Sequence, residues 1–505
     1  MKGRSQFLFA MAGILCLAIG GVWSFYASRR YKEKHYVVDA ASCRMNLVVL
    51  ERKDSPPTSE AGSVVLLHGI SANQNIMHYL ARSFAELGLR VFIPDLPGHG
   101  HSPGPFTPEL AESCSASLVR GLAARGMLIP ERTILAGHSM GGAIALRIAE
   151  RTRPAGVIAI SPAPMQPAHG VIHENLLYHD VPHIGPNARI LVGQLEPGGL
   201  TENARDLVPN NGGPIPSFTI VPWNTHVSML FSPTVAIDSQ AWASLVLALP
   251  ETTRLPSRGN IFGCLLGFAG ILLLAGPCIR DLLGKEQRPD AAPALPRRKF
   301  RGALELVILS LFAIHLFHYW QPLRVLHLFQ GAYLASFFLI VGVGLILFHL
   351  REGRAQVRVR LRLLLGAAFA ATLLYFLITG WFELTATSAW LTSQRWERFP
   401  LFLIAAFLFL YGLELISGPV ESTRTRYGYW LLLTVLAWLA LSFGVLYLKS
   451  GEFLLVLLSP YFALQFIFAG LGAHLVRRLT GSATAAAMFG AILLAGLCLV
   501  LFPVS

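Results

Sequence analysis

The stretch that decides the fold is RTILAGHSMGGAIALRIAER, residues 132–151. Its first five residues predict a short buried strand, and the residues after GHSMGG predict a helix. Glycines on both sides of Ser139 match G-x-S-x-G, a sharp strand-to-helix turn that holds the serine in a strained backbone conformation. Gly137 and Gly141 lack the Cβ atoms that would collide where strand and helix nearly touch. The pattern therefore predicts an accessible Ser139 hydroxyl beside a helix N-terminus, which favours negative charge.

The composition around this stretch is that of a polytopic membrane protein. Of the 505 residues, 53% are hydrophobic and only 14% are charged, and the mean hydropathy is +0.53. The net charge is +13. The basic residues stand beside apolar runs, where membrane topology accounts for them. The basic patches with interleaved aromatics that RNA-binding proteins carry are absent, so no nucleic-acid partner is expected.

The N-terminal segment predicts a membrane anchor. Residues 7–26 form an apolar run of about 20 residues behind Lys2 and Arg4, a length that suits a membrane span. We therefore interpret residues 1–28 as a signal-anchor helix. A cleaved signal peptide is the alternative, and it would leave the following domain in the same place.

Residues 29–255 form a domain of different character, in which short strand-like runs alternate with helical ones. This alternation predicts a mostly parallel sheet with helices on its faces. An opening hairpin is expected over HYVVDA and MNLVVLER. The buried strands are expected in SVVLLHG, LRVFIPD, RTILA, GVIAIS, ARILVGQ and PSFTIVP.

Across roughly residues 36–255 the chain resembles the α/β-hydrolase family. The matching motifs are His68-Gly69 after an apolar strand, PDLPGHGHS (94–102), GHSMGG, an acidic residue after ILVGQ, and a late HVSML (226–230). The resemblance covers a little under half of the chain. It implies an α/β-hydrolase domain with a short lid, because only about 26 residues separate GVIAIS from ARILVGQ.

The resemblance implies a catalytic triad. Ser139 would be the nucleophile, His226 the base and Glu196 the acid, in the family's order of serine, acid and histidine. The chain departs from the family in carrying Glu where Asp is commoner, and Asp206 and Asp180 are alternative acids. The backbone N–H groups of Ile70 and Met140 would form the oxyanion hole.

The remaining histidines are interpreted as structural. His68, His99 and His101 flank the site, but the family's triad histidine comes late in the chain. Four more crowd the lid segment, and they lack the Cys or paired carboxylates of a metal site. These are His169, His173, His179 and His183. Neither a metal nor a cofactor is expected.

The cysteines limit the disulfides. Cys43 and Cys114 alone lie in the polar half, so at most one disulfide is expected there, with two free buried thiols as the alternative.

The rest of the chain predicts a membrane domain. Apolar runs predict one helix over 256–282, a basic Pro-rich linker over 283–302 and a seven-helix domain over 303–505. The seven spans are expected near 303–320, 329–350, 363–382, 399–418, 428–448, 453–476 and 483–503. With the anchor, the total is about nine. The 303–320 span is the weakest, because it carries Glu305, His315 and His318.

Charge predicts the orientation of these helices. With a cytoplasmic N-terminus, the short inside loops carry most of the Lys and Arg, and the positive-inside rule favours that arrangement. The inside residues are Arg280, Lys285, Arg288, Arg297, Arg298, Lys299, Arg301, Arg351, Arg354, Arg358, Arg360, Arg362, Arg424, Arg426, Arg477 and Arg478; the outside ones are Arg324, Arg395, Arg398 and Lys449. The hydrolase-like domain is then extracytoplasmic. The basic cluster Arg29, Arg30, Lys32 and Lys34 falls outside, but long domains translocate largely regardless of charge.

Together these features predict a membrane-anchored serine hydrolase that cleaves an ester, thioester or amide through an acyl-enzyme. Its expected partners are a lipid-like or other small acyl substrate and the lipid bilayer. One alternative is an acyltransferase using the same triad. Another is a non-catalytic transporter or scaffold with a hydrolase-like outer binding domain. The sequence fixes neither the substrate nor the oligomeric state.

Overall fold

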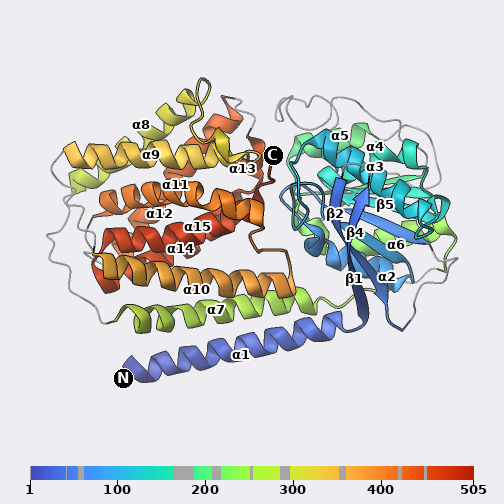
Figure 1. The fold of residues 1–505 in the computed structure, drawn as a ribbon, viewed down its shortest axis with the longest axis horizontal. Coiled ribbons are helices and arrows are strands. Elements are labelled where there is room, and N and C mark those ends of the chain that lie inside the picture. Colours follow the sequence, from blue (N-terminus) through green and yellow to red (C-terminus); the bar gives the residue numbers. More distant parts are fainter. Residues whose placement is uncertain are drawn as a thin grey trace. The chain divides into compact units, whose positions relative to one another are not determined.

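The computed structural model describes residues 2–40, 43–54, 62–163, 187–207, 218–250, 254–284, 296–351, 360–418, 423–448 and 452–505. The chain divides into two compact units (Figure 1). The sheet unit comprises Gly20–Cys264, Phe382–Ser388 and Pro503–Ser505. The helical unit comprises Met1–Ile19, Leu265–Trp381 and Ala389–Phe502.

The sheet unit is built on one eight-stranded sheet in the order β1-β2-β4-β3-β5-β6-β7-β8. Its strands are β1 (Tyr31–Ala40), β2 (Cys43–Arg52), β3 (Ser63–Leu67), β4 (Arg90–Pro94), β5 (Thr133–His138), β6 (Gly156–Ile160), β7 (Ala188–Gly193) and β8 (Phe218–Val221). β1 and β2 form the expected hairpin, and β2 pairs antiparallel with β4. All other pairs are parallel, which confirms the mostly parallel sheet.

Helices cover the sheet and bury its strands, as the continuous apolar runs require. They are α2 (His78–Glu86), α3 (Pro108–Ala124), α4 (Met140–Thr152), α5 (Gly198–Asp206) and α6 (Pro233–Leu247), with short 3-10 turns η1 (Gln74–Met77), η2 (Pro130–Arg132) and η3 (Ser228–Phe231). One core joins α2 and α6 to alternate strand residues such as Leu66 and Ile134. α3 packs on α4. Cys43 and Cys114 form a disulfide, with Cα atoms 5.6 Å apart, that ties the start of β2 to α3.

Two short segments from far along the chain belong to the sheet unit. Phe382–Ser388 follows more than 100 residues after the last helix of the sheet unit, and Pro503–Ser505 ends the sequence. The N–H of Val504 donates to the carbonyl of Gly98 at 3.1 Å, and its carbonyl accepts from the N–H of Phe106. The sheet unit is therefore not a single continuous stretch of sequence.

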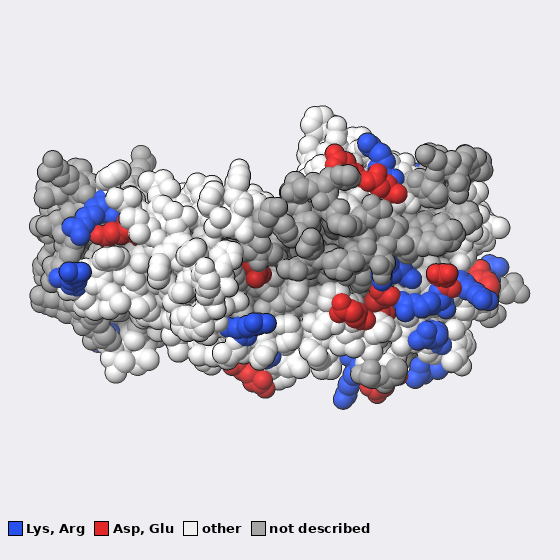
Figure 2. All heavy atoms as spheres, turned by 90° about the horizontal axis from the view of Figure 1, so that it is seen from above, with Lys and Arg blue, Asp and Glu red and all other residues white. Residues whose placement is uncertain are grey.

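The described residues contain eight helices long and apolar enough to cross a membrane. The helices that carry these spans are α1 (Lys2–Ser28), α7 (Gly259–Leu283), α9 (Gly331–Arg351), α10 (Leu361–Thr385), α11 (Ser393–Ser417), α12 (Thr423–Leu446), α14 (Ser459–Thr480) and α15 (Ala483–Leu501). Over the helical unit, the face in Figure 2 shows a wide uncharged band, with charged side chains gathered toward its ends. The chain is thus a multi-pass membrane protein.

The sequence predicts about nine spans, one more than the eight candidates among the described residues. The expected 303–320 span lies in α8 (Pro296–Leu316), which is not among the eight by composition because its first turns are strongly basic. α8 also begins inside the expected linker 283–302. The expected 453–476 span divides into α13 (Phe453–Leu457) and α14.

Candidate active site

Ser139 occupies the predicted sharp turn between β5 and α4. Its φ is +54° and its ψ is −118°, a conformation that a non-glycine residue keeps only when its surroundings enforce it. A Cβ on Gly137 would lie 2.2 Å from the carbonyl oxygen of Gly141, and a Cβ on Gly141 would lie 2.3 Å from that of Leu67. Both glycines are therefore sterically required, as the motif predicts.

His226 and Glu196 lie together at the carboxyl edge of the sheet. His226 Nδ1 is 3.0 Å from Glu196 Oε2. Glu196 Oε1 accepts from the N–H of Gly193 at 2.7 Å and from the hydroxyl of Ser161. The side chain of Glu196 is 0% exposed and that of His226 is 8% exposed. A buried carboxylate with this many donors is held in one place.

The contact with Glu196 sets the tautomer of His226. Because the carboxylate can only accept, Nδ1 carries the proton and Nε2 is left as the acceptor. Nε2 is buried and has no hydrogen-bond partner among the described residues. The hydrogen bond from Ser139 Oγ that a general base would accept at Nε2 is therefore not formed in this structure, whereas the bond between His226 and Glu196 is.

The turn and the His226 loop are in direct contact. Nε2 of His138, the residue before Ser139, is 2.8 Å from the carbonyl oxygen of His226. The two rings have centroids 4.8 Å apart. Burial lowers the pKa of His138 to about 3, so its ring is neutral. The ring packs against His226 and donates a hydrogen bond to its backbone carbonyl.

The alternative acids stand apart from this arrangement. Asp206 is the last residue of α5 and is exposed. Asp180 lies outside the described residues, as do His169, His173, His179 and His183 and the lid to which they were assigned. Of the carboxylates that the structure describes, Glu196 is the one bonded to His226.

The predicted oxyanion residues flank the turn. A Cβ on Gly69 would lie 3.0 Å from the Cβ of Ser139. The carbonyl of Gly69 accepts from His68 Nδ1 at 2.8 Å and from the N–H of Ala72 at 3.2 Å. The N–H of Ile70 belongs to the same planar trans peptide and points in the opposite direction from the Gly69 carbonyl. Met140 begins α4, so its N–H has no acceptor within the helix.

His68, His99 and His101 take structural positions. His68 Nε2 accepts from the N–H of Leu96 at 2.9 Å, and burial lowers the pKa of His68 to about 4, which keeps it neutral. His99 is buried, with Nδ1 2.9 Å from the carbonyl oxygen of Pro97. His101 is exposed, and its Nε2 lies 3.1 Å from Glu383 Oε1.

Two contributors to the site escape the sequence analysis. His138 lies inside the quoted motif, but its role depends on the approach of His226, 88 residues later. Ser161 ends the predicted strand GVIAIS and donates to Glu196, 35 residues later. Neither has a local signal. Within the described ranges, no cluster of three or more His, Cys, Asp or Glu residues could hold a metal ion.

Comparison with protein-family models agrees with the fold of the sheet unit. Residues 62–258 match the family model of the alpha/beta hydrolase fold. A sequence comparison with curated proteins finds no match.

Solved structures resemble the same part of the chain. An alpha-beta serine hydrolase homologue from Coxiella burnetii has 15% identity over 43% of this chain and 96% of its own, with a TM-score of 0.32. A thermophilic esterase from Thermogutta terrifontis has 18% identity over 43% and 99%, with a TM-score of 0.32. A bacterial membrane phospholipase A has 20% identity over 48% and 95%, with a TM-score of 0.35. At these values they say nothing about the substrate.

The family-model match and the sheet order together define the fold of one part of the chain. Residues 62–258 have the alpha/beta hydrolase fold. The chain joins this fold to helices that include eight candidate membrane spans among the described residues.

Proposed function

We propose that this protein is a membrane-anchored serine hydrolase that cleaves an ester, thioester or amide through an acyl-enzyme. The observation that carries the proposal is the pairing of His226 with buried Glu196 beside the Ser139 turn, with Nε2 of the histidine left as an acceptor. A binding module needs no such relay. Strain at Ser139 also has a function in an enzyme, because it presents the hydroxyl.

The chemistry proceeds in two acyl transfers. Ser139 Oγ attacks the acyl carbon while His226 Nε2 takes the hydroxyl proton. The N–H groups of Ile70 and Met140 stabilise the oxyanion, and the His226 imidazolium, paired with Glu196, returns the proton to the leaving group. Water then attacks the acyl-enzyme while His226 Nε2 takes one of its protons. That proton passes to Ser139 Oγ as the acyl bond breaks, which releases the acid and restores the serine hydroxyl.

We further propose that the hydrolase domain is extracytoplasmic and that the chain crosses the membrane nine times. The positive-inside count supports the orientation. The Cys43–Cys114 disulfide supports it too, because such bonds persist in oxidising compartments.

The two distant segments of the sheet unit support α8 as the ninth crossing. Because Phe382–Ser388 belongs to the sheet unit, the chain must cross an even number of times between residues 258 and 382. The helices in that interval are α7, α8, α9 and α10, so the number is even only when α8 crosses. Four further spans, α11, α12, α14 and α15, then bring Pro503–Ser505 back to the same side.

Packing within the helical unit favours the same interpretation. Tyr429 of α12 donates its hydroxyl to the carbonyl of Lys299 in α8, and a Cβ on Gly444 would meet Ile314. α8 thus runs parallel to the candidate span α12 over 15 residues, about 22 Å at 1.5 Å per residue. Its 21 residues reach about 31 Å, enough for the hydrocarbon core.

Reporter fusions in the full chain test the topology. With nine crossings, reporters inserted after residues 258 and 320 read extracytoplasmic, and one after residue 355 reads cytoplasmic. With eight, the readings at 320 and 355 exchange, and that exchange would refute α8 as a span.

A fluorophosphonate probe tests the enzyme. The full chain in detergent should be labelled covalently, and Ser139→Ala should abolish both labelling and hydrolysis of short acyl esters. Persistent labelling of Ser139→Ala would remove this residue from its role. Product analysis with an added alcohol separates the alternatives: acyl transfer to the alcohol in preference to water indicates an acyltransferase. An unlabelled, inert but folded protein would favour the non-catalytic scaffold.

A further inference from the structure

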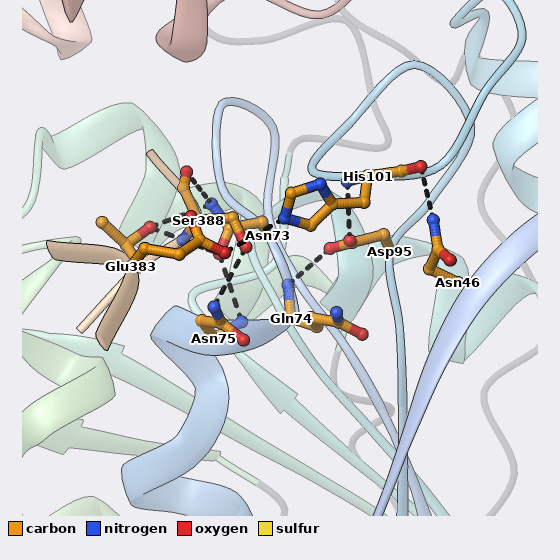
Figure 3. A network of polar contacts seen from close by, with 9 residues as sticks. Asn46, Asn73, Gln74, Asn75, Asp95, His101, Glu383 and Ser388 are labelled. Carbon is orange, nitrogen blue, oxygen red and sulfur yellow. Dashed lines mark hydrogen bonds and ion pairs between the residues drawn. The ribbon is translucent and has the colours of Figure 1, made fainter. Parts of the chain in front are cut away.

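Residues 387 and 388, which follow the membrane-span candidate α10, are bonded to the loop that carries the proposed oxyanion residue Ile70. Asn73 Nδ2 donates to Thr387 Oγ1 at 2.9 Å and to the carbonyl of Ser388 at 3.2 Å. Asn73 Oδ1 accepts from the N–H of Ser388 at 3.2 Å. Asn75 Nδ2 donates to Ser388 Oγ at 3.0 Å. Figure 3 shows Asn73, Asn75 and Ser388 converging from the two segments.

The loop at residues 69–75 needs external support. Ser71 has a φ of +60°, in the left-handed region that a non-glycine residue rarely adopts because of steric strain. Its hydroxyl is buried with no partner among the described residues. Within the loop, two backbone N–H bonds are made, from Ala72 to the Gly69 carbonyl and from Asn75 to Asn73 Oδ1. A strained conformation persists only where neighbouring structure holds it.

Asp95 holds the loop on its other side. Its buried carboxylate accepts from the N–H of Gln74 at 2.8 Å and from the N–H of His101 at 2.9 Å. A Cβ on Gly100 would lie 2.3 Å from that carboxylate, so the turn closes tightly around it. The His101 side chain reaches Glu383 at 3.1 Å (Figure 3). Asp95 fixes the end of the loop to the sheet, and residues 383–388 fix its outer side.

Burial makes the contacts with residue 388 consequential. Asn73 is 5% exposed and Ser388 is 2% exposed, so water does not readily replace a partner that is removed. The asparagine uses both its amide donor and its carbonyl acceptor on one short segment. Because donor and acceptor are both bonded, the Asn73 side chain is held in one orientation against residues 387 and 388.

We propose that Thr387 and Ser388 are positioning residues that hold the 69–75 loop, and with it the Ile70 amide, in register with Ser139. This inference rests on the proposed serine-hydrolase function. It gives Thr387 and Ser388, which follow α10 but belong to the sheet unit, a role at a site whose reacting groups lie some 160 to 250 residues earlier. A fragment ending near residue 255 lacks that segment.

The test is the double variant Thr387→Val/Ser388→Ala in the full chain, with Leu384→Ala as its control. Leu384 lies in the same segment but is 79% exposed. Removing an oxyanion donor outright costs 10²–10³ in kcat, so displacing one should cost about 10-fold. We expect kcat to fall by that factor with KM within about 2-fold, because the amide acts mainly on the transition state. Affinity for a boronic acid that mimics the tetrahedral intermediate should fall in parallel.

A double-mutant cycle separates positioning from general damage. If Ser388 acts through Asn75, then Asn75→Ala should add little to the loss in Ser388→Ala. Should the double variant fail to fold, the single variant Ser388→Ala, which removes one side-chain hydrogen bond, decides with an expected loss of about 3-fold.

Each outcome bears on one proposal. Unchanged kcat and boronate affinity in the folded variants, with Ser139→Ala inert, would overturn the positioning role and leave the hydrolase function intact. An equal loss in Leu384→Ala would also overturn it. Activity retained in Ser139→Ala would instead refute the hydrolase function itself.

Discussion

Replacing Glu196 by Gln tests the proposed relay most directly, because the two side chains have the same shape. The carboxylate now accepts from three donors: the Gly193 N–H and Ser161 hydroxyl on Oε1, and His226 Nδ1 on Oε2. Glutamine offers one oxygen and one NH₂ group. Keeping the oxygen toward Gly193 and Ser161 satisfies two donors and turns the NH₂ toward His226.

That orientation reverses the histidine tautomer. Nδ1 must then accept, so the proton moves to Nε2, which can no longer take the proton of Ser139. The charge that stabilises the imidazolium is lost as well. The comparable change in a serine-protease triad lowers kcat about 10⁴-fold, or about 5 kcal/mol in the barrier. We expect a loss of that order here, with little change in KM.

The assay is hydrolysis of a short acyl ester by the full chain, with the fluorophosphonate labelling rate as a second measure. Asp206→Asn is the matched control, because Asp206 is an exposed carboxylate from the following helix. We expect it to retain wild-type kcat. A Glu196→Gln variant within 10-fold of wild type would refute the relay. If Asp206→Asn carried the loss, the acid would have to be reassigned.

Three further predictions concern stability. Opening the Cys43–Cys114 disulfide, which joins residues 71 apart, should destabilise the hydrolase domain by about 4 kcal/mol on the chain-entropy model. The denaturant midpoint should therefore be lower with reductant than without it, and an equal midpoint would contradict this prediction. The pKa of His68 is about 4 in the folded chain and about 6.5 when unfolded, so the unfolded state binds more protons between these values. The free energy of unfolding should therefore fall by about 3 kcal/mol as the pH drops from 6.5 to 4. Thermal unfolding should show a smaller fall over the same pH range in His68→Gln. Gly141→Ala should cost about 3 kcal/mol or more, since its Cβ meets backbone at 2.3 Å, whereas Gly199→Ala, with nothing within 4 Å, should stay within about 1 kcal/mol in the same measurement.

The local features of this protein follow from the sequence alone. The Ser139 turn depends on two glycines four residues apart, so its steric requirement is written within one short stretch. The apolar runs specify buried parallel strands, and the hairpin over residues 35–40 and 45–52 follows from two adjoining strand patterns. Helices of the membrane half need only length and apolar composition. These are short-range properties, which neighbouring residues determine.

The tertiary structure decided what depends on approach across long separations. It brought Glu196 rather than Asp206 to His226, because the loops after β7 and β8 meet at the sheet edge. It paired Cys43 with Cys114. It also bonded Asn73 to Ser388, 315 residues later. No periodicity or local propensity encodes such contacts, since they arise only when packing of the whole chain fixes which loops become neighbours.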